Sequence, residues 1–297
     1  MKGSDVLTRN APERTRPVGA ARARVRLRWR GGAAQAALYG ALLVVAAIYL
    51  FPLLYLVNVA LKTPQAYLSD PTGMTTSLDL SNFGDAWVRG NFAHYFGNTI
   101  FYTAAATAIG VTCSLLVAFP IARGYVKWSG AWYTFFVVSI FLPGALIPQF
   151  QLMLHLHLYN TQIGYILLSS GLGIGPFMIA GYLRSIPREL DEAASIDGCG
   201  YARYLAMIVT PLIKPILVTA ALLQAIGVWN DIILPTIYLS SPSYSPVSLG
   251  LFTFYGQYGN DWTVLAAAVL IVAAPLIVFF VFLQRYFMEG ATAGAIK

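Results

Sequence analysis

Six long apolar runs constrain this chain more than any other feature of its sequence. Each run is long enough to cross a bilayer as a helix, which takes about 20 residues. Only 10% of the residues are charged, whereas a soluble globular domain carries about 25%. We therefore expect an all-α polytopic membrane protein with six transmembrane helices. The predicted spans are residues 34–61, 97–122, 131–154, 162–183, 213–236 and 261–285.

The basic residues predict the orientation of these spans. If both termini lie in the cytoplasm, all but two of the 19 Lys and Arg residues fall on the cytoplasmic side, and the exceptions are Lys62 and Arg89. Cytoplasmic segments of membrane proteins carry such an excess of positive charge. Residues 1–33 are strongly basic and poor in apolar residues, so we expect a disordered cytoplasmic tail. Residues 34–297 are predicted to form the transmembrane domain.

The sequence lacks the common motifs of soluble enzymes. It has no G-x-x-x-x-G-K-[ST], and none of its lysines follows a glycine, so it cannot cradle ATP phosphates in a P-loop. His155 and His157 are two residues apart, and on a helix they would point in different directions, which suits a shared metal poorly. The basic charge belongs to the tail and the inner segments, which argues against a nucleic-acid partner. We expect no catalytic residue, no metal and no cofactor in this chain.

A polar segment, residues 185–215, separates the fourth and fifth spans; we call it the coupling loop. Ser185 is the expected N-cap of a short helix, and Pro187 is expected in its first turn. Acidic residues follow near the helix N-terminus, where the helix dipole favours them. Gly198 is predicted to end this helix at a positive φ. The result would be an L-shaped pair of short helices outside the bilayer, with an ordinary amphipathic connector as the alternative.

The coupling loop carries a recognisable pattern. Residues 192–198 read E-A-A-S-I-D-G, and residues 208–215 read I-V-T-P-L-I-K-P. This pair resembles the cytoplasmic "EAA" loop of permease subunits in binding-protein-dependent ABC importers, roughly E-A-A-x-x-D-G-A and then I-x-L-P-x-x-x-P. Cys199 stands where the family has Ala, and Thr210 stands where it has Leu. Both replacements are small or medium-sized.

The resemblance implies a division of labour. The residues implied to couple to a cytoplasmic ATPase are Glu192, Ala193, Ala194, Asp197 and Gly198. ATP and Mg would be bound by two ATPase subunits and not by this chain. The other implied partners are a second homologous permease subunit and an external sugar-binding protein. The implied location is a bacterial-type cell membrane.

The end of the chain resembles the carbohydrate-uptake branch of this family. Residues 284–297 read Q-R-Y-F-M-E-G-A-T-A-G-A-I-K, close to that branch's Q-R-y-f-v-x-G-x-t-x-G-A-v-K. The chain is similar to the smaller, six-span subunit of the maltose-type pair, which implies import of a sugar, most simply a disaccharide or oligosaccharide. Import of glycerol phosphate, a polyol, an amino acid or a peptide is the main alternative. A non-transporting membrane assembly or sensor protein is a further one.

Side chains near the predicted external ends of the third and fifth spans suit a sugar pathway. They combine hydrogen-bonding groups with aromatic rings, the mixture that sugar hydroxyls and CH faces require. The candidates are Gln149, Phe150, Gln151, Trp229, Asn230 and Asp231. Asp231 is an acid inside an apolar run, so it is either a pathway or subunit contact or a hydrated helix end. The external segments 62–96 and 237–260 favour contact with a soluble partner, with a solvated connector as the alternative.

Overall fold

The computed structural model describes residues 32–75, 78–256 and 259–295, and the side chains of residues 35–75, 78–254 and 261–282. The predicted disordered tail therefore lies outside the described residues, except for its last two positions, which begin a helix. The described chain is helical apart from one antiparallel pair of two-residue strands, in which Tyr255 opposes Asn260 and Gly256 opposes Gly259. The prediction that helices dominate the fold is confirmed. The prediction that the fold is entirely helical is corrected by this small hairpin.

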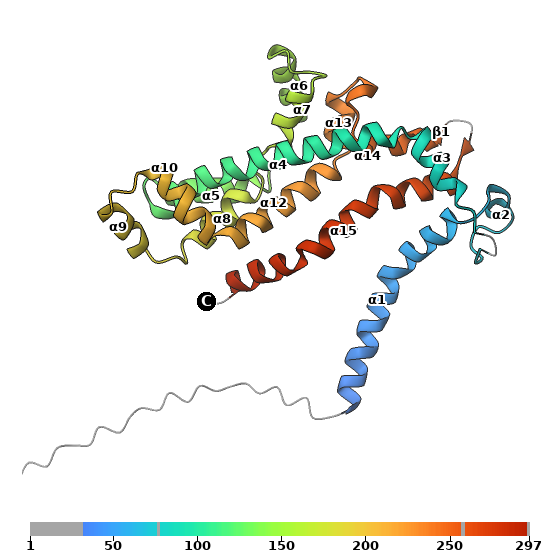
Figure 1. Cartoon of the computed structure of the whole chain (residues 1–297), viewed down its shortest axis with the longest axis horizontal. Coiled ribbons are helices and arrows are strands. Elements are labelled where there is room, and N and C mark those ends of the chain that lie inside the picture. Colours follow the sequence, from blue (N-terminus) through green and yellow to red (C-terminus); the bar gives the residue numbers. More distant parts are fainter. Residues whose placement is uncertain (1–31, 76–77, 257–258, 296–297) are drawn as a thin grey trace, which may run out of the picture. The chain divides into compact units, whose positions relative to one another are not determined.

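Fifteen α-helices are described in these ranges, several of them short (Figure 1). They are α1 (Gly32–Ala60), α2 (Pro64–Ser69), α3 (Ser81–Arg89), α4 (Phe92–Arg123), α5 (Ser129–Ser139), α6 (Leu146–His155), α7 (Gln162–Ser169), α8 (Gly175–Leu183), α9 (Glu189–Ile196), α10 (Tyr201–Tyr204), α11 (Thr210–Leu212), α12 (Lys214–Trp229), α13 (Ile233–Tyr238), α14 (Val247–Gly250) and α15 (Trp262–Ala295). A π-helix, η1 (Leu205–Val209), two 3₁₀ turns, η2 (Pro242–Tyr244) and η3 (Leu251–Phe254), and the strands β1 (Tyr255–Gly256) and β2 (Gly259–Asn260) complete the list.

The chain divides into two compact units between Phe51 and Pro52. The described part of the first unit, residues 32–51, is a stretch of helix α1. The second unit holds all the remaining elements. The coupling loop, residues 185–215, lies wholly in the second unit.

Three described helices are long and apolar enough to cross a membrane unaided: α1, α4 and the first part of α15. They confirm the predicted first, second and sixth runs as continuous helices. The chain is thus a membrane protein with several apolar helices. A fourth candidate is the pair formed by residues 201–212 and 214–229, which is bent by 84° at its break.

The predicted third, fourth and fifth runs are each broken into two helices. The third breaks after α5, where Pro143 and Gly144 interrupt the pattern, and the fourth breaks between α7 and α8 within a glycine-rich stretch. Breaks at membrane depth persist only where the protein satisfies the freed backbone groups. At the fourth run, Gln224 does this, because its Nε2 donates to the carbonyl oxygen of Ser169 at 2.6 Å.

Helix α4 is the centre of the second unit. It packs along both α8 and α12, which also contact each other (Figure 1). A core cluster at its C-terminal end includes Phe119, Ile179, Leu183 and Ile213, all fully buried. This cluster joins the ends of α4, α8 and α12 to the segment that contains α9.

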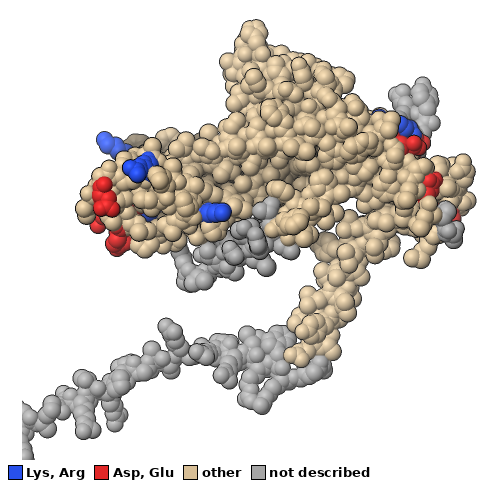
Figure 2. All heavy atoms as spheres, viewed as in Figure 1, with Lys and Arg blue, Asp and Glu red and all other residues tan. Residues whose placement is uncertain are grey.

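Charged side chains of the second unit gather at its two ends. Figure 2 shows Lys, Arg, Asp and Glu at the end that carries α9 and α10 and near the opposite end by α3, with an almost uncharged surface between them. This distribution suits a chain whose middle contacts lipid, because charge at bilayer depth is costly. We refer below to the α9 end and the α3 end.

Candidate coupling site

Helix α9 forms the projecting part of the coupling loop. Its first turn carries Glu189, Asp191 and Glu192, as predicted. Ser185 is not its N-cap, which corrects the prediction, because the Ser185 hydroxyl donates back to the carbonyl of Tyr182 at 2.7 Å and closes the end of α8 instead. Pro187 lies before α9 and not in its first turn, so the α9 N-terminus is stabilised by acidic side chains and not by a hydroxyl cap.

The turn after α9 has the predicted geometry. Gly198 has φ +67°, in the left-handed region. The amide of Cys199 then donates to the carbonyl of Ala194 at 2.9 Å, which closes the helix end. Among the described residues nothing lies within 4 Å of a Cβ placed on Gly198. Glycine is therefore required here by backbone conformation and not by lack of space.

The five residues implied to touch an ATPase do not share one face. Glu192, Ala193, Asp197 and Gly198 are exposed. Ala194 is buried and belongs to the core cluster at the end of α4, so only Ala193 of the two alanines is exposed to a partner. A residue that the sequence reasoning missed stands beside them: the side chain of Ile196 is 86% exposed. An apolar residue inside a polar turn was the available signal.

A buried arginine holds the base of the coupling loop, and the sequence reasoning missed its role. Arg123, the last residue of α4, is 4% exposed. Its guanidinium donates from Nη1 to the carbonyl of Ile186 at 2.9 Å and to the carbonyl of Leu183 at 3.3 Å. Its Nε lies 2.8 Å from the Oδ2 of Asp191, forming an ion pair. One side chain thus links the ends of α4 and α8 to the first turn of α9.

Tyr204 of α10 completes this cluster. Its hydroxyl donates to the Oδ1 of Asp191. Burial of the ring and the bond to the carboxylate together raise the pKa of Tyr204 to about 12, so the phenol keeps its proton at neutral pH. We call Arg123, Asp191 and Tyr204 the Arg123 clamp. The signals available in sequence were a basic residue at the end of a span and an acid beside the E-A-A string.

The second half of the coupling loop is wound irregularly before the fifth run begins. After α10 the chain forms the π-helix η1, and the Thr210 hydroxyl donates to the carbonyl of Leu205 at 2.8 Å. Pro211 follows and has no N–H to continue a regular ladder. The Thr at this position, where the resembled family has Leu, therefore closes the π turn with its side chain. Helix α12 then leaves at the 84° bend.

The predicted pathway residues do not line one common site. Gln149 accepts a hydrogen bond from the hydroxyl of Tyr238 at 3.3 Å, and the Phe150 ring lies 6.0 Å from the Tyr238 ring. Gln151 is exposed on α6. Asn230 is exposed and its amide donates to the carbonyl of Ile226 at 2.9 Å.

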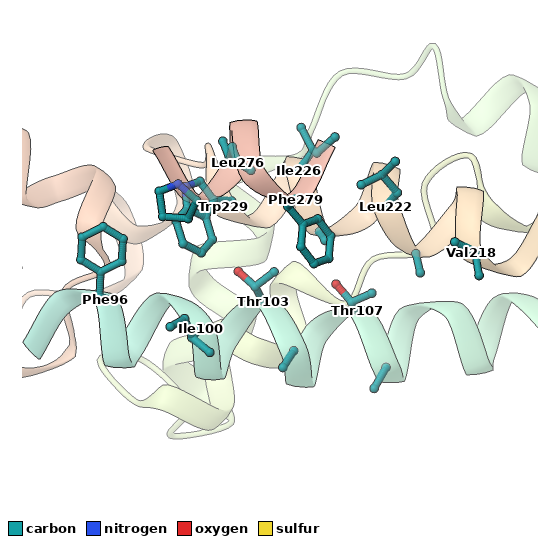
Figure 3. Close-up of a pocket in the computed structure, with 15 residues that line it drawn as sticks. Phe96, Ile100, Thr103, Thr107, Val218, Leu222, Ile226, Trp229, Leu276 and Phe279 are labelled. Atoms are coloured by element: carbon teal, nitrogen blue, oxygen red, sulfur yellow. The ribbon is translucent and has the colours of Figure 1, made fainter. Parts of the chain in front are cut away.

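Asp231 and Trp229 have structural partners of their own. The Asp231 carboxylate accepts a hydrogen bond from the amide of Leu234 at 3.1 Å and so caps the start of α13. Trp229 is buried and lines a pocket of about 590 Å³ between α4, α12 and α15 (Figure 3). Figure 3 also shows Thr103 and Thr107 on this side of α4. Among the described residues their hydroxyls have no hydrogen-bond partner.

Comparisons with known proteins agree with this architecture. Residues 110–290 match the family described as binding-protein-dependent transport system inner membrane component. The chain is 29% identical over 259 residues to the melibiose/raffinose/stachyose import permease protein MelC of Bacillus subtilis, covering 86% of this chain and 94% of that one. It is 32% identical over 252 residues to a probable ABC transporter permease, YurM, of the same organism, covering 83% of each.

A solved structure shares the fold. It is a crystal structure of a bacterial ABC transporter involved in the import of the acidic polysaccharide alginate, with a TM-score of 0.76 and 22% sequence identity. The match covers 86% of this chain and 96% of that chain. The match therefore extends well beyond the coupling loop, over most of both chains.

Proposed function

Because this chain belongs to the family of binding-protein-dependent transport system inner membrane components, we propose that it is the transmembrane permease subunit of an ATP-driven importer for a disaccharide or oligosaccharide. It forms half of the translocation pathway together with a second, related permease. Two cytoplasmic ATPase subunits bind ATP and Mg, and an external binding protein delivers the sugar. The chain itself performs no bond-making chemistry.

The observation that carries this proposal is the exposed turn of α9. Glu192, Ala193 and Gly198 are exposed at the α9 end, and the Gly198 turn is closed by the bond from the Cys199 amide to the Ala194 carbonyl. A rigid, acidic helix that protrudes from a membrane domain suits a cleft in a soluble partner. Closure of an ATPase dimer on ATP would displace such a helix as a rigid body, and the broken runs would then switch the open side of the pathway.

The sugar is supported by two independent lines. The sequence of residues 284–297 resembles the carbohydrate-uptake branch, and the relative MelC is named for import of melibiose, raffinose and stachyose. Choice of the individual sugar rests mainly with the binding protein, since Gln149, Asn230 and Asp231 of this chain are engaged in hydrogen bonds within the chain.

Two experiments test the proposal. Affinity purification of the tagged chain from its native membrane should recover a second permease and an ATPase, and the purified complex should hydrolyse ATP faster when the external binding protein is added with its sugar. Calorimetric titration of that binding protein with maltose, melibiose, raffinose, glycerol 3-phosphate and amino acids should give binding with a sugar. Binding of glycerol 3-phosphate or an amino acid alone would establish the alternative solute class, and no ATPase in the complex would refute the importer.

Topology gives a further check. We propose that both termini and the coupling loop are cytoplasmic and that the chain makes six passes. Reporter fusions at Lys297 and within residues 237–260 should then give opposite signals. Signals from the same side would refute the proposed arrangement of spans.

A further inference from the structure

Among the side chains that the structure describes, the Arg123 clamp is the buried charge cluster of the second unit that the proposed function leaves without a role. The side chains of Arg123 and Asp191 are 3% and 12% exposed, whereas the ion pair at the opposite end, Arg89 with Asp261, is about half exposed on both sides. A surface ion pair contributes little to stability. A buried ion pair is costly to separate, because each charge would then be left without a partner and without water.

The clamp joins the elements that must move together if the importer is coupled. Arg123 belongs to α4, which packs along both α8 and α12. Its guanidinium also holds the two carbonyls at the end of α8, and Asp191 begins α9. Tyr204 reaches the same carboxylate from α10, beyond the Gly198 turn. Both arms of the coupling loop therefore share one carboxylate that pairs with α4. The α10 arm also contacts α4 through edge-to-face packing of Phe119 against Tyr201 and Tyr204.

We propose that Arg123 is a positioning residue for energy coupling: its ion pair with Asp191, together with Tyr204, makes α9 move as one body with the end of α4. The inference rests on the proposed function. Apolar contacts of Ala194 alone could let α9 slide or tilt against the core, because they are not directional. The clamp is directional, since a planar guanidinium donates along fixed axes from Nη1 to two carbonyls and Tyr204 donates to the carboxylate. The Nε of Arg123 makes no hydrogen bond within the described part of the chain and adds the charge attraction of the ion pair.

The test uses the complete complex in nanodiscs, with both permeases, the ATPase and the external binding protein. The probe is ATP hydrolysis, measured as phosphate release with and without sugar-loaded binding protein. Arg123→Met should keep the basal rate and lower the stimulation by binding protein about tenfold, the size of an ordinary coupling between sites. Arg123→Lys, which keeps the charge but loses the fork of donors, should retain part of the stimulation.

Three companion variants separate coupling from simple destabilisation. Asp191→Asn preserves shape and should lower the stimulation as Arg123→Met does, and it decides the question if Arg123→Met does not assemble. The double variant Arg123→Met/Asp191→Asn should be no worse than the worse single one, because both changes break the same interaction. Lys127→Gln removes an equal charge from an exposed position near the end of α4 and should change nothing.

The outcomes distinguish this inference from the proposed function. If the wild-type complex hydrolyses ATP without any stimulation by the binding protein, the proposed function itself is refuted. If the wild type is stimulated and Arg123→Met or Asp191→Asn keeps its full stimulation, the clamp does not transmit movement. Basal and stimulated rates that fall in proportion to the amount of assembled complex would equally overturn the inference, since they would reveal a stabilising role alone.

Discussion

The two ends of the second unit are held together by different chemistry. At the α3 end, residues 237–260 are attached to α4 by neutral hydrogen bonds: the amide of Asn98 donates to the carbonyls of Ser243 and Ser245, both at 3.0 Å. At the α9 end, a buried ion pair fixes one side of α9 while the other side stays exposed. Several neutral hydrogen bonds suit a segment that stays fixed against α4. A single buried ion pair beneath an exposed helix suits an element that a partner protein moves.

The largest expected effect lies at the α3 end. Asn98→Ala should destabilise the folded protein by about 2–3 kcal/mol, because two carbonyls of the covering segment lose their donor. Thermal unfolding in detergent would measure it. Asn230→Ala is the matched control, since its exposed amide bonds only within its own helix end, and it should shift the melting temperature little. Equal shifts would remove the contrast between a structural asparagine and a surface one.

A smaller effect is expected at the α9 end. Gly198→Ala should cost about 1 kcal/mol, because an L-residue is strained at φ +67°. The strain should appear mainly as lost stimulation of ATP hydrolysis, with assembly preserved. Gly200→Ala is the control: this glycine is equally open but has φ −66°, which any residue adopts. Loss of stimulation in both variants would show that small size, and not conformation, matters in this turn.

A modest effect is expected for the cap of α13. Asp231→Ala should slow sugar uptake by about threefold through loss of a capping bond worth about 1 kcal/mol. Asp231→Asn keeps the acceptor oxygen and should transport nearly normally. The imported sugar should be the same in both variants. A changed sugar preference in competition uptake assays would place a selectivity site in this chain and would contradict the role assigned to the binding protein.

The smallest effect concerns pH. The pKa of Tyr204 is raised from 10.0 to about 12, so the stabilisation from its bond to Asp191 is fully present below pH 10 and is lost only as pH rises toward 12. Stimulation of ATP hydrolysis attributable to Tyr204, measured as the wild-type to Tyr204→Phe ratio, should therefore be flat between pH 6 and 9. A ratio that changes within this window would mean that another group titrates in the clamp.

Local patterns predicted the turn at Gly198 but not the anchoring of the loop that contains it. The E-A-A string and Gly198 could be interpreted from spacing and backbone rules, and the φ of Gly198 confirms the turn. Ser185 was assigned to the wrong helix end, because a hydroxyl four residues before α9 can serve either the helix it follows or the helix it precedes. The capping propensity of serine does not distinguish these two helix ends. The position of Pro187 does, because the residue before a proline is disfavoured in a helix.

The sequence by itself determined the class of this protein, since length and apolarity of the runs depend on no contact between them. It also determined where the chain turns, at glycines and prolines whose backbone limits are local. Only the tertiary structure decided that Ala194 faces inward. It alone joined Arg123 to Asp191, 68 positions apart in the chain. That pairing requires α4 and α9 to lie close together in the folded chain. A buried charge is paired with whichever opposite charge the fold brings close to it, because burial removes the water that would otherwise solvate it. No local sequence pattern contains this information.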